Sequence, residues 1–291
     1  MSLETLSDAS CDAPLRLAPG LYIVAGPIGN LSDLTPRAAE ILRLADVVAV
    51  EDTRVSARLL RHAGSDRPMI PYHDHSDERV RSRLVERMAS EAVALLSDAG
   101  TPLISDPGYK LVRDARAAGR AVTTAPGPCA LIAALTLSGL PTDRFLFLGF
   151  LPNKEKARGD VLAEVAGLRA TLVTYESGPR TARTLAAMAD VLGNREAAVA
   201  REISKTFEEV ATGTLVALAD RYADAPPRGE IVIVVGPPLD EPVVAAAEDV
   251  DAALLDAMTR LPASKAAGEV AKRFGLDRRT LYDRAQELKD R

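Results

Sequence analysis

The feature that most constrains the fold is a regular alternation of short apolar segments with longer amphipathic ones. LYIVAG from Leu21, DVVAVE from Asp46 and AVALLS from Ala92 each read as a buried strand. Between the first two lies LTPRAAEILRLA, where apolar residues recur at helical spacing and Thr35 and Pro36 can cap and begin a helix. Strands alternating with helices favour a parallel, doubly wound α/β domain, in which AVALLS is the third expected strand.

A second set of elements follows Pro126-Gly127-Pro128, a triplet that can continue neither a helix nor a strand. Apolar runs such as FLFLGFL, ATLVTYES and GEIVIVV predict strands, and hairpin-type spacing near 200–236 indicates a mixed sheet. Three helices are expected near the end, at 251–259, 263–274 and 277–289, with helix-turn-helix-like spacing around Gly275. The expected organisation is a disordered tail at 1–17, α/β domains at 18–127 and 128–238, an acidic linker at 239–250 and a helical domain at 251–291.

Composition places the chain among ordinary folded proteins. Of its 291 residues 47% are hydrophobic and 26% charged, which allows a substantial core. Only Cys11 and Cys129 are cysteines, so a disulfide framework is not expected and a reducing cytoplasm is. Acidic residues at 4, 8 and 12 precede the first apolar run, whereas a secretory signal peptide begins with positive charge. The longest apolar stretch is too short to span a bilayer as a helix. We expect a soluble cytoplasmic protein.

Charge is unevenly distributed along the chain. The net charge of −5 does not favour a general nucleic-acid binder. However, residues 54–87 hold eight arginines against five acids, and residues 260–291 hold nine Lys or Arg against five acids. Such runs are often only solvated faces, but two basic segments around an acidic stretch also fit an anionic partner.

The first strand-to-helix turn, AGPIGNLSD at 25–33, has features of a cofactor loop. Gly26 and Gly29 allow a ligand to approach the backbone, and Glu51 lies where a dinucleotide fold places its ribose-binding acid. A third glycine is missing, however, and Pro27 interrupts the pair. A dinucleotide site is therefore the weaker interpretation.

A second loop, SDAGTPLISDPG at 97–108, repeats a Ser-Asp pair before a turn bearing Gly and Pro. Asp98 directly follows a buried strand, and ligands of open α/β sheets bind at the carboxyl ends of strands. Hydroxyls, glycines and the apolar Ile104 favour a small ligand that is partly polar and partly apolar. Without Lys or Arg, the loop does not suit a polyphosphate. A plain surface connection remains the alternative.

Seven segments follow one another in a characteristic order along residues 20–238. They are YIVAGPIGNLSDLTPRAAEIL, VVAVEDTRVSARLL, SDAGTPLISDPGYKLV, APGPCALIAALTLSGLPTDRFLFLGFLP, YESGPR, REISKTFEE and GEIVIVV. In these segments and their order the chain resembles the ribosomal RNA small subunit methyltransferase I family of the tetrapyrrole methylase superfamily. The tail LPASKAAGEVAKRFGLDRRTLYDRAQ also looks like that family's C-terminal domain.

The resemblance implies two α/β domains of the tetrapyrrole methylase type with S-adenosylmethionine in the inter-domain cleft, plus a small C-terminal helical domain. It implies a homodimer that methylates the ribose 2′-hydroxyl of a cytidine in 16S rRNA, near the decoding centre. The residues it assigns to the cofactor are Pro27, Asp98, Gly100, Thr101, Ile104, Cys129, Ala130, Tyr175, Glu230 and Ile231. Cys129 departs from the family's usual serine, which weakens any hydrogen bond from that side chain.

Methyl transfer to a hydroxyl requires a group that takes the proton. Candidates are Asp52, Glu176, Lys205 and Glu208, each of which could instead form an ion pair that fixes a loop. We expect Arg54, Arg201 and Lys205 to hold RNA phosphates.

Few aromatics (4%) and no tryptophan argue against stacking on single-stranded RNA, so a small ribosomal subunit read by shape is the expected partner. His73 and His75 are too few to hold a metal, so no metal is expected and their loop is taken to face RNA. The remaining alternatives are methylation of a tetrapyrrole or another small acceptor, and a nucleic-acid-binding regulator.

Overall fold

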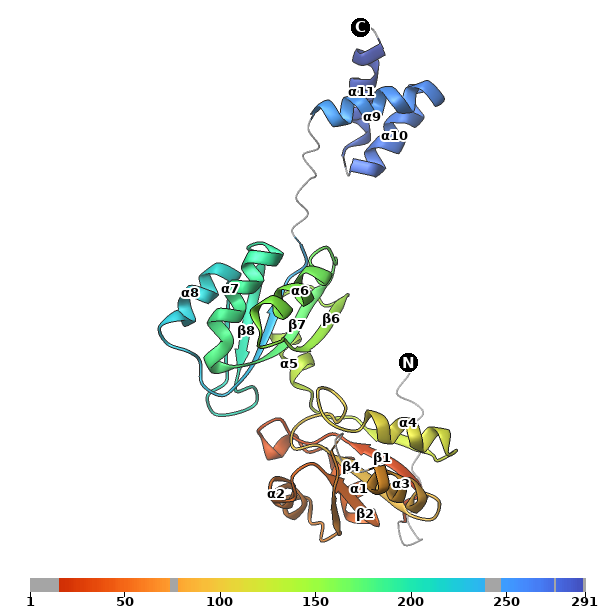
Figure 1. Ribbon diagram of the computed structural model, residues 1–291, viewed down its shortest axis with the longest axis vertical. Coiled ribbons are helices and arrows are strands. Elements are labelled where there is room, and N and C mark those ends of the chain that lie inside the picture. Colours follow the sequence, from red (N-terminus) through yellow and green to blue (C-terminus); the bar gives the residue numbers. More distant parts are fainter. Residues whose placement is uncertain (1–15, 74–77, 239–246, 275, 290–291) are drawn as a thin grey trace. The chain divides into compact units, whose positions relative to one another are not determined.

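The structure is a computed structural model that describes residues 16–73, 78–238, 247–274 and 276–289 (Figure 1). The chain divides into two compact units, Met1–Pro237 and Pro238–Arg291. Residues 1–15 of the expected tail, 239–246 of the expected linker, His75 and Gly275 lie outside the described residues. Among the described residues, no helix is both long enough and apolar enough to cross a bilayer.

The first half of the larger unit (residues 20–125) is built on a sheet whose strand pairs are all parallel. Its strand order is β3-β2-β4-β1-β5. The strands are β1 (Gly20–Val24), β2 (Val47–Val50), β3 (Met69–Pro71), β4 (Ala92–Leu96) and β5 (Val122–Ala125). The parallel α/β fold expected from the alternating pattern is therefore confirmed.

Helices cover both faces of this sheet because alternate strand residues point to opposite sides. Val48 and Val50 pack with α1 (Pro36–Leu44) and α2 (Thr53–Ala63), whereas their neighbours in β2 pack with α3 (Glu78–Arg87) and α4 (Tyr109–Ala117). The expected helix signals are present: Thr35 Oγ1 accepts a hydrogen bond from Ala38 N (3.1 Å), and Gly64 ends α2 at φ 70°. A short 3-10 helix, Leu31–Asp33, precedes α1.

The second half (residues 130–235) holds the expected mixed sheet, ordered β6-β7-β10-β8-β9. Only β6 and β7 are parallel, and the other three pairs are antiparallel. The strands are β6 (Phe145–Phe150), β7 (Thr171–Ser177), β8 (Glu196–Arg201), β9 (Glu209–Thr214) and β10 (Glu230–Val235).

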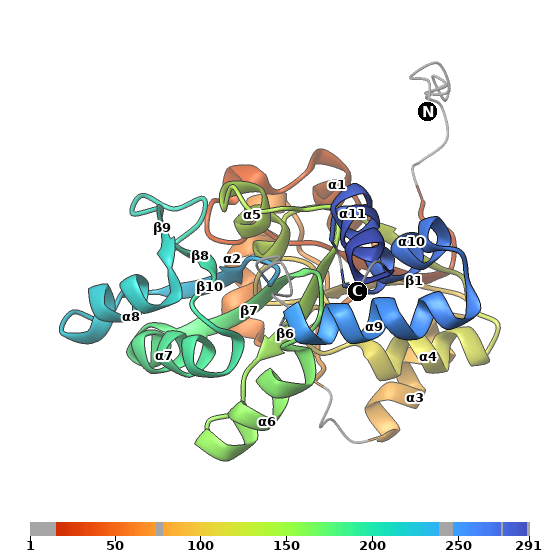
Figure 2. The same cartoon turned by 90° about the horizontal axis from the view of Figure 1, so that it is seen from above.

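One face of this second sheet is covered by helices, among which α7 and α8 pack side by side (Figures 1 and 2). These helices are α6 (Glu155–Val165), α7 (Thr181–Leu192) and α8 (Leu215–Ala223), and a 3-10 turn at Gly178–Arg180 leads into α7. The opposite face carries α5 (Ala130–Leu137) and receives Ile28 and Ile104 from the first half. Each half has its own core, and the two halves share this one apolar cluster.

Three elements were not predicted from the sequence. β3 has only three residues, follows Pro68 and ends at Pro71, and these prolines hide a strand signal. β9 reads EVATGT, with too few apolar residues for a clear alternation, and α8 follows it directly. Because β3 was missed, the strand before the 97–108 loop is the fourth in the chain and not the third. It remains central in the sheet, between β2 and β1.

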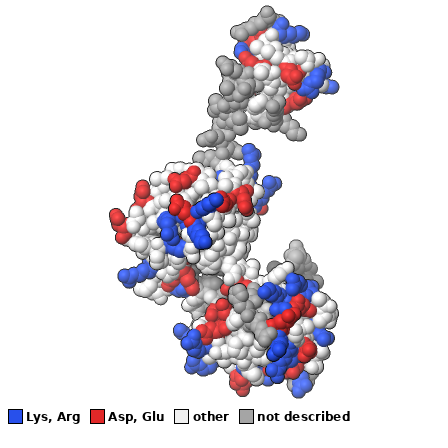
Figure 3. All heavy atoms as spheres, viewed as in Figure 1, with Lys and Arg blue, Asp and Glu red and all other residues white. Residues whose placement is uncertain are grey.

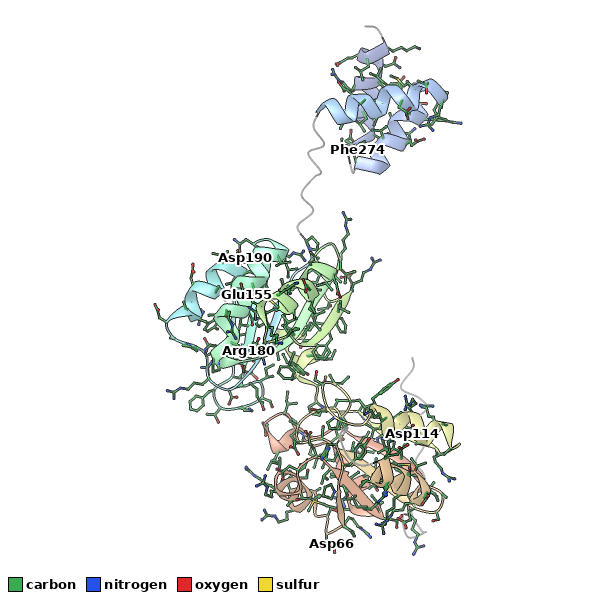
Figure 4. The ribbon with its side chains drawn as sticks, viewed as in Figure 1. Asp66, Asp114, Glu155, Arg180, Asp190 and Phe274 are labelled. Carbon is green, nitrogen blue, oxygen red and sulfur yellow. The ribbon has the colours of Figure 1, made fainter. Side chains whose placement is uncertain are left out.

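The smaller unit contains α9 (Ala247–Arg260), α10 (Ala263–Phe274) and α11 (Arg278–Lys289). Their buried core includes Leu254 and Leu281, and Phe274 at the end of α10 packs against it (Figure 4). The expected helices are confirmed, with α9 beginning four residues earlier than expected, at Ala247.

Candidate functional site

A cavity of about 330 Å³ opens where the two halves of the larger unit meet. The first half contributes Ile28 from its first strand-to-helix turn and much of the 97–108 loop. The second half contributes the start of α5, the carboxyl end of β7 and the amino end of β10. The volume falls in the range of about 300–1,000 Å³ that is usual for small-molecule sites.

Eight of the ten side chains or backbone positions expected to bind a cofactor line this cavity. From the first half they are Gly100, Thr101 and Ile104. From the second half they are Cys129, Ala130, Tyr175, Glu230 and Ile231.

The structure does not bring the other two, Pro27 and Asp98, to the lining. Pro27 is buried, and its carbonyl accepts a hydrogen bond from Gly100 N (3.2 Å). Asp98 Oδ1 accepts a hydrogen bond from Asp52 N (3.2 Å), which ties the turn after β2 to the loop after β4. Both residues therefore support the wall of the cavity from behind.

Two isoleucines enter the cavity from opposite halves on the same unusual backbone pattern. Ile104 lies between Leu103 (φ 73°) and Ser105 (φ 63°), and Ile203 between Glu202 (φ 49°) and Ser204 (φ 67°). In the part of the chain that the structure describes, no other residue except glycine has a positive φ. Such strained conformations gather at ligand sites, because each must be held in place by its surroundings.

Direct contacts hold the two halves together around the cavity. Thr101 Oγ1 donates a hydrogen bond to the Pro128 carbonyl (2.9 Å), and the Ser204 hydroxyl donates one to Asp33. Gly29 approaches Lys205 so closely that an added Cβ would lie 2.4 Å from the lysine side chain. Gly29 (φ 145°) is thus required both for its backbone conformation and for this approach.

The lining is acidic. It includes Asp106, Glu176 and Glu230, and no Lys, Arg or His is among the described residues that line it. Apolar side chains such as Ile28 and Ile231 form much of the remaining wall. This set of groups suits a small, partly apolar ligand with positive charge and opposes a polyphosphate.

Asp106 lies on this lining, and sequence analysis gave it no role. The pKa of its carboxyl is raised to about 6, mainly by burial and further by the charges of Glu51 and Asp98, although a hydrogen bond from Ser97 lowers it. One sequence feature could have identified Asp106 as a site residue. The 97–108 loop repeats a Ser-Asp pair, and Asp106 is the acid of the second pair.

Glu176 forms part of the lining, but its carboxylate is held by three partners. It accepts hydrogen bonds from Ser177 N (2.7 Å) and Thr184 Oγ1 (2.6 Å), and Arg180 Nε lies 3.1 Å away. Its side chain is only 1% exposed. Arg180 is at the start of α7 and Asp190 near its other end (Figure 4).

Asp52 and Arg54 lie outside the cavity lining and pair with each other. Arg54 Nη2 is 2.8 Å from Asp52 Oδ2, and Asp52 also caps α2 by accepting a hydrogen bond from Arg54 N (2.8 Å). These hydrogen bonds hold the pKa of the Asp52 carboxyl at about 2. The Arg54 side chain is 88% exposed, on a half whose surface mixes Lys and Arg with Asp and Glu (Figure 3).

Lys205 lies at the edge of the site and joins two carboxylates. Its Nζ is 3.0 Å from Glu202 Oε1 and 2.9 Å from Glu230 Oε2. Burial works against the charged amine, but these hydrogen bonds raise the pKa of Lys205 above its usual value. Lys205 is therefore protonated, which does not favour a role as proton acceptor.

The two remaining residues expected near RNA or the proton also have partners. Arg201 Nε is 2.6 Å from Glu209 Oε2, and Glu208 accepts a hydrogen bond from Ser204 N (2.6 Å). Neither residue lines the cavity.

Tyr175 gives the lining an aromatic corner. Its ring meets Phe147 and Phe150 edge-on, with centroids 4.8 and 5.6 Å apart. Burial, above all, raises the pKa of the Tyr175 hydroxyl, so this group is neutral. Of the alternating histidines only His73 is described, and among the described residues no three His, Cys, Asp or Glu side chains cluster as metal ligands would.

Comparison with known proteins gives two family matches. Residues 20–219 match the family described as Tetrapyrrole (Corrin/Porphyrin) Methylases, and residues 244–289 match the RsmI C-terminal HTH domain.

Curated relatives are similar over nearly the whole chain, and each is named Ribosomal RNA small subunit methyltransferase I. The protein of Erythrobacter litoralis is 56% identical over 275 residues, which cover 94% of this chain and 96% of the relative. That of Mesorhizobium japonicum is 51% identical and covers 96% of each chain. That of Pseudomonas aeruginosa is 45% identical and covers 91% of this chain and 96% of the relative.

Solved structures share the fold at lower identity. Diphthine synthase is 18% identical with a TM-score of 0.59, over 74% of this chain and 89% of that protein. The uroporphyrin-III C-methyl transferase from Thermus thermophilus, complexed with S-adenyl homocysteine, is 22% identical with a TM-score of 0.52. That match covers 75% of this chain and 97% of the other.

Proposed function

Because the chain belongs to the ribosomal RNA small subunit methyltransferase I family of the tetrapyrrole methylases, we propose that it methylates RNA with S-adenosylmethionine as donor. The acceptor is the ribose 2′-hydroxyl of a cytidine in 16S rRNA, near the decoding centre. The observation that carries this proposal is the acid-lined cavity formed jointly by both halves. Its lining includes eight residues that the family resemblance assigns to the donor.

The cavity fits a sulfonium donor in both charge and shape. Asp106 and Glu230 place negative charge around it, while Ile104, Ile203 and Ile231 provide apolar surface. At Gly100 (φ 69°) an added Cβ would lie 3.1 Å from the Ile28 side chain, so glycine is needed to keep this side of the cavity open. The bound sulfonium supplies an electrophilic methyl group.

The chain's own task is to align the acceptor and to exclude water. The apolar side chains from both halves keep the site dry, and the hydrogen bond between Thr101 and Pro128 fixes one half against the other. Holding the two reactants in line converts a bimolecular encounter into an oriented one, which can account for much of the rate. The hydroxyl proton must also be taken by a nearby group.

RNA would be held mainly by exposed arginines of the first half. Arg54, Arg58 and Arg61 are all exposed on α2, and Arg54 keeps its charge accessible despite its pairing with Asp52. Arg201 and Lys205 would first have to exchange carboxylate partners for phosphates. A net charge of −5 supports a pre-formed surface, such as a small ribosomal subunit, over free RNA as the substrate.

The domain boundaries at 127 and 238, the homodimer and the cytoplasmic location belong to the same proposal. Separate sheets with separate cores support the first boundary, and the compact helical unit supports the second. The helical unit would contact either RNA or the second subunit.

The test supplies tritiated S-adenosylmethionine with purified small subunits, naked 16S rRNA or a tetrapyrrole. Label in small subunits, at a nucleotide that resists alkaline cleavage, is the expected result, because methylation blocks the 2′-oxygen that attacks the backbone. Label in the tetrapyrrole alone would favour a small-acceptor enzyme. Donor binding without transfer to any of the three would favour a regulator.

A further inference from the structure

Resting on the proposed methyl transfer to a ribose hydroxyl, we infer that the Asp106 carboxylate takes the hydroxyl proton. Asp106 lies on the lining of the shared cavity, in the loop that also presents Gly100, Thr101 and Ile104. None of the proton acceptors expected from the sequence combines a place on this lining with an available carboxylate.

Three carboxylates line the cavity, and their surroundings separate them. Glu176 is almost fully buried and is engaged by Arg180, Ser177 N and Thr184. Glu230 forms an ion pair with Lys205 (2.9 Å). Among the described residues, Asp106 forms no ion pair with a Lys or Arg. The Ser97 hydroxyl lowers its pKa, but that hydroxyl also lies within hydrogen-bond distance of the Ala99 and Gly100 carbonyls (3.2 and 3.3 Å).

The groups around Asp106 increase its affinity for a proton. Glu51 follows β2 and Asp98 follows β4, and both place negative charge near it, while burial disfavours its ionised form. From the second half, Tyr175 and Cys129 face the same space, and the charge of Asp106 adds to the burial that raises the pKa of the Tyr175 hydroxyl. The resulting pKa of about 6 leaves Asp106 ionised at neutral pH, yet makes it a far better proton acceptor than an ordinary aspartate.

The step balances without any further reactant. The O–H bond of the ribose hydroxyl breaks, and its proton passes to an Asp106 oxygen. The ribose oxygen forms a bond to the methyl carbon, and the carbon–sulfur bond breaks with its electron pair remaining on sulfur. Asp106 then releases the proton to water and returns to its ionised form.

The main experiment compares wild type with Asp106→Asn in the full-length protein. Asp190→Asn is the matched control, because Asp190 is an exposed aspartate on α7 and does not line the cavity (Figure 4). The single-turnover rate of methyl transfer to small subunits should fall about 10²- to 10⁴-fold in Asp106→Asn and stay unchanged in Asp190→Asn. In wild type the rate should rise tenfold per pH unit below about pH 6 and level off above it.

A second measurement does not depend on turnover. We expect the sulfur of S-adenosylhomocysteine to face Asp106, and because this thioether is uncharged, binding should respond little to the charge at position 106. Calorimetry should give affinities within threefold of wild type for Asp106→Asn at pH 8. In Asp106→Ala, added formate should restore part of the lost rate, because a small carboxylate can occupy the space of the missing one.

Several results would overturn the inference. They are a rate for Asp106→Asn within fivefold of wild type, a wild-type rate that is flat between pH 5 and 7.5, or a loss of S-adenosylhomocysteine binding that matches the loss of rate. If Asp106→Asn does not fold, the wild-type pH profile and the formate rescue decide. If wild type methylates no RNA acceptor, the proposed function itself fails, whereas an active wild type with an active Asp106→Asn removes only the role of Asp106.

Discussion

The hydrogen bond from Thr184 to Glu176 should contribute more to stability than a matched bond one helical turn away. Thr184 Oγ1 donates to the buried Glu176 carboxylate at 2.6 Å, and Thr181 Oγ1 donates to the Ser177 carbonyl at 3.1 Å. Both threonines are on α7 and fully buried, so valine preserves the shape of each. The two bonds differ in the charge of the acceptor and, with it, in length.

The expected magnitudes follow from that difference. A hydrogen bond to a charged group contributes about 1.5–3 kcal/mol, and one between neutral groups about 0.5–1.5 kcal/mol. Thr184→Val should therefore lower the free energy of unfolding by about 2 kcal/mol and Thr181→Val by about 1 kcal/mol. In a unit of this size these values correspond to about 4–8 °C and 2–4 °C in Tm.

Urea and thermal unfolding of the full chain, followed by circular dichroism, would measure both variants. Because Glu176 lines the cavity, Thr184→Val should also weaken S-adenosylhomocysteine binding, and Thr181→Val should not. Equal losses of stability in the two variants, or a larger loss in Thr181→Val, would refute the view that a buried charged acceptor dominates this part of the wall.

Three further changes have defined outcomes. The Asp106 pKa rises on folding from 3.8 to about 6, so the stabilisation by its bound proton is complete below pH 4 and lost as pH rises through 6. Asp106→Asn should therefore stabilise the fold by about 1–3 kcal/mol at pH 8 and hardly at pH 4, and equal urea-unfolding shifts at both pH values would contradict this. Gly229→Ala would place a Cβ 2.1 Å from Glu202 Oε1 at φ 91°, so calorimetry should show at least tenfold weaker S-adenosylhomocysteine binding. Gly159→Ala, with nothing within 4 Å, is its control and should bind normally. Arg54→Ala should raise the KM for small subunits severalfold and leave the affinity for the donor unchanged. The slope of log binding constant against log salt concentration should become smaller by about one.

The sequence predicted those parts of the fold that depend on local pattern. The run from Val47 to Val50 is buried on both faces, as a central parallel strand must be, and Thr35 with Pro36 marked the start of α1 correctly. β3 and β9 were not predicted because their formation depends on pairing with neighbouring strands rather than on a pattern in their own residues. A three-residue strand beside prolines carries almost no signal of its own.

The site was predictable only in part, for a related reason. The resemblance identified positions such as Gly100 and Ile231 by their place in motifs. It could not show that Asp52 is engaged by Arg54, that Glu176 is fully buried, or that Asp106 keeps an available carboxylate. Those properties arise from contacts between segments far apart in the chain, which no local pattern contains.

The central claim is that the cavity shared by the two halves holds the methyl donor. A crystal structure of the full chain with S-adenosylhomocysteine tests it most directly. Density for the whole ligand between Ile104 of the first half and Ile231 of the second, with its sulfur facing Asp106, is the predicted result. Density at another place on the protein, with this cavity empty or closed, would contradict the account.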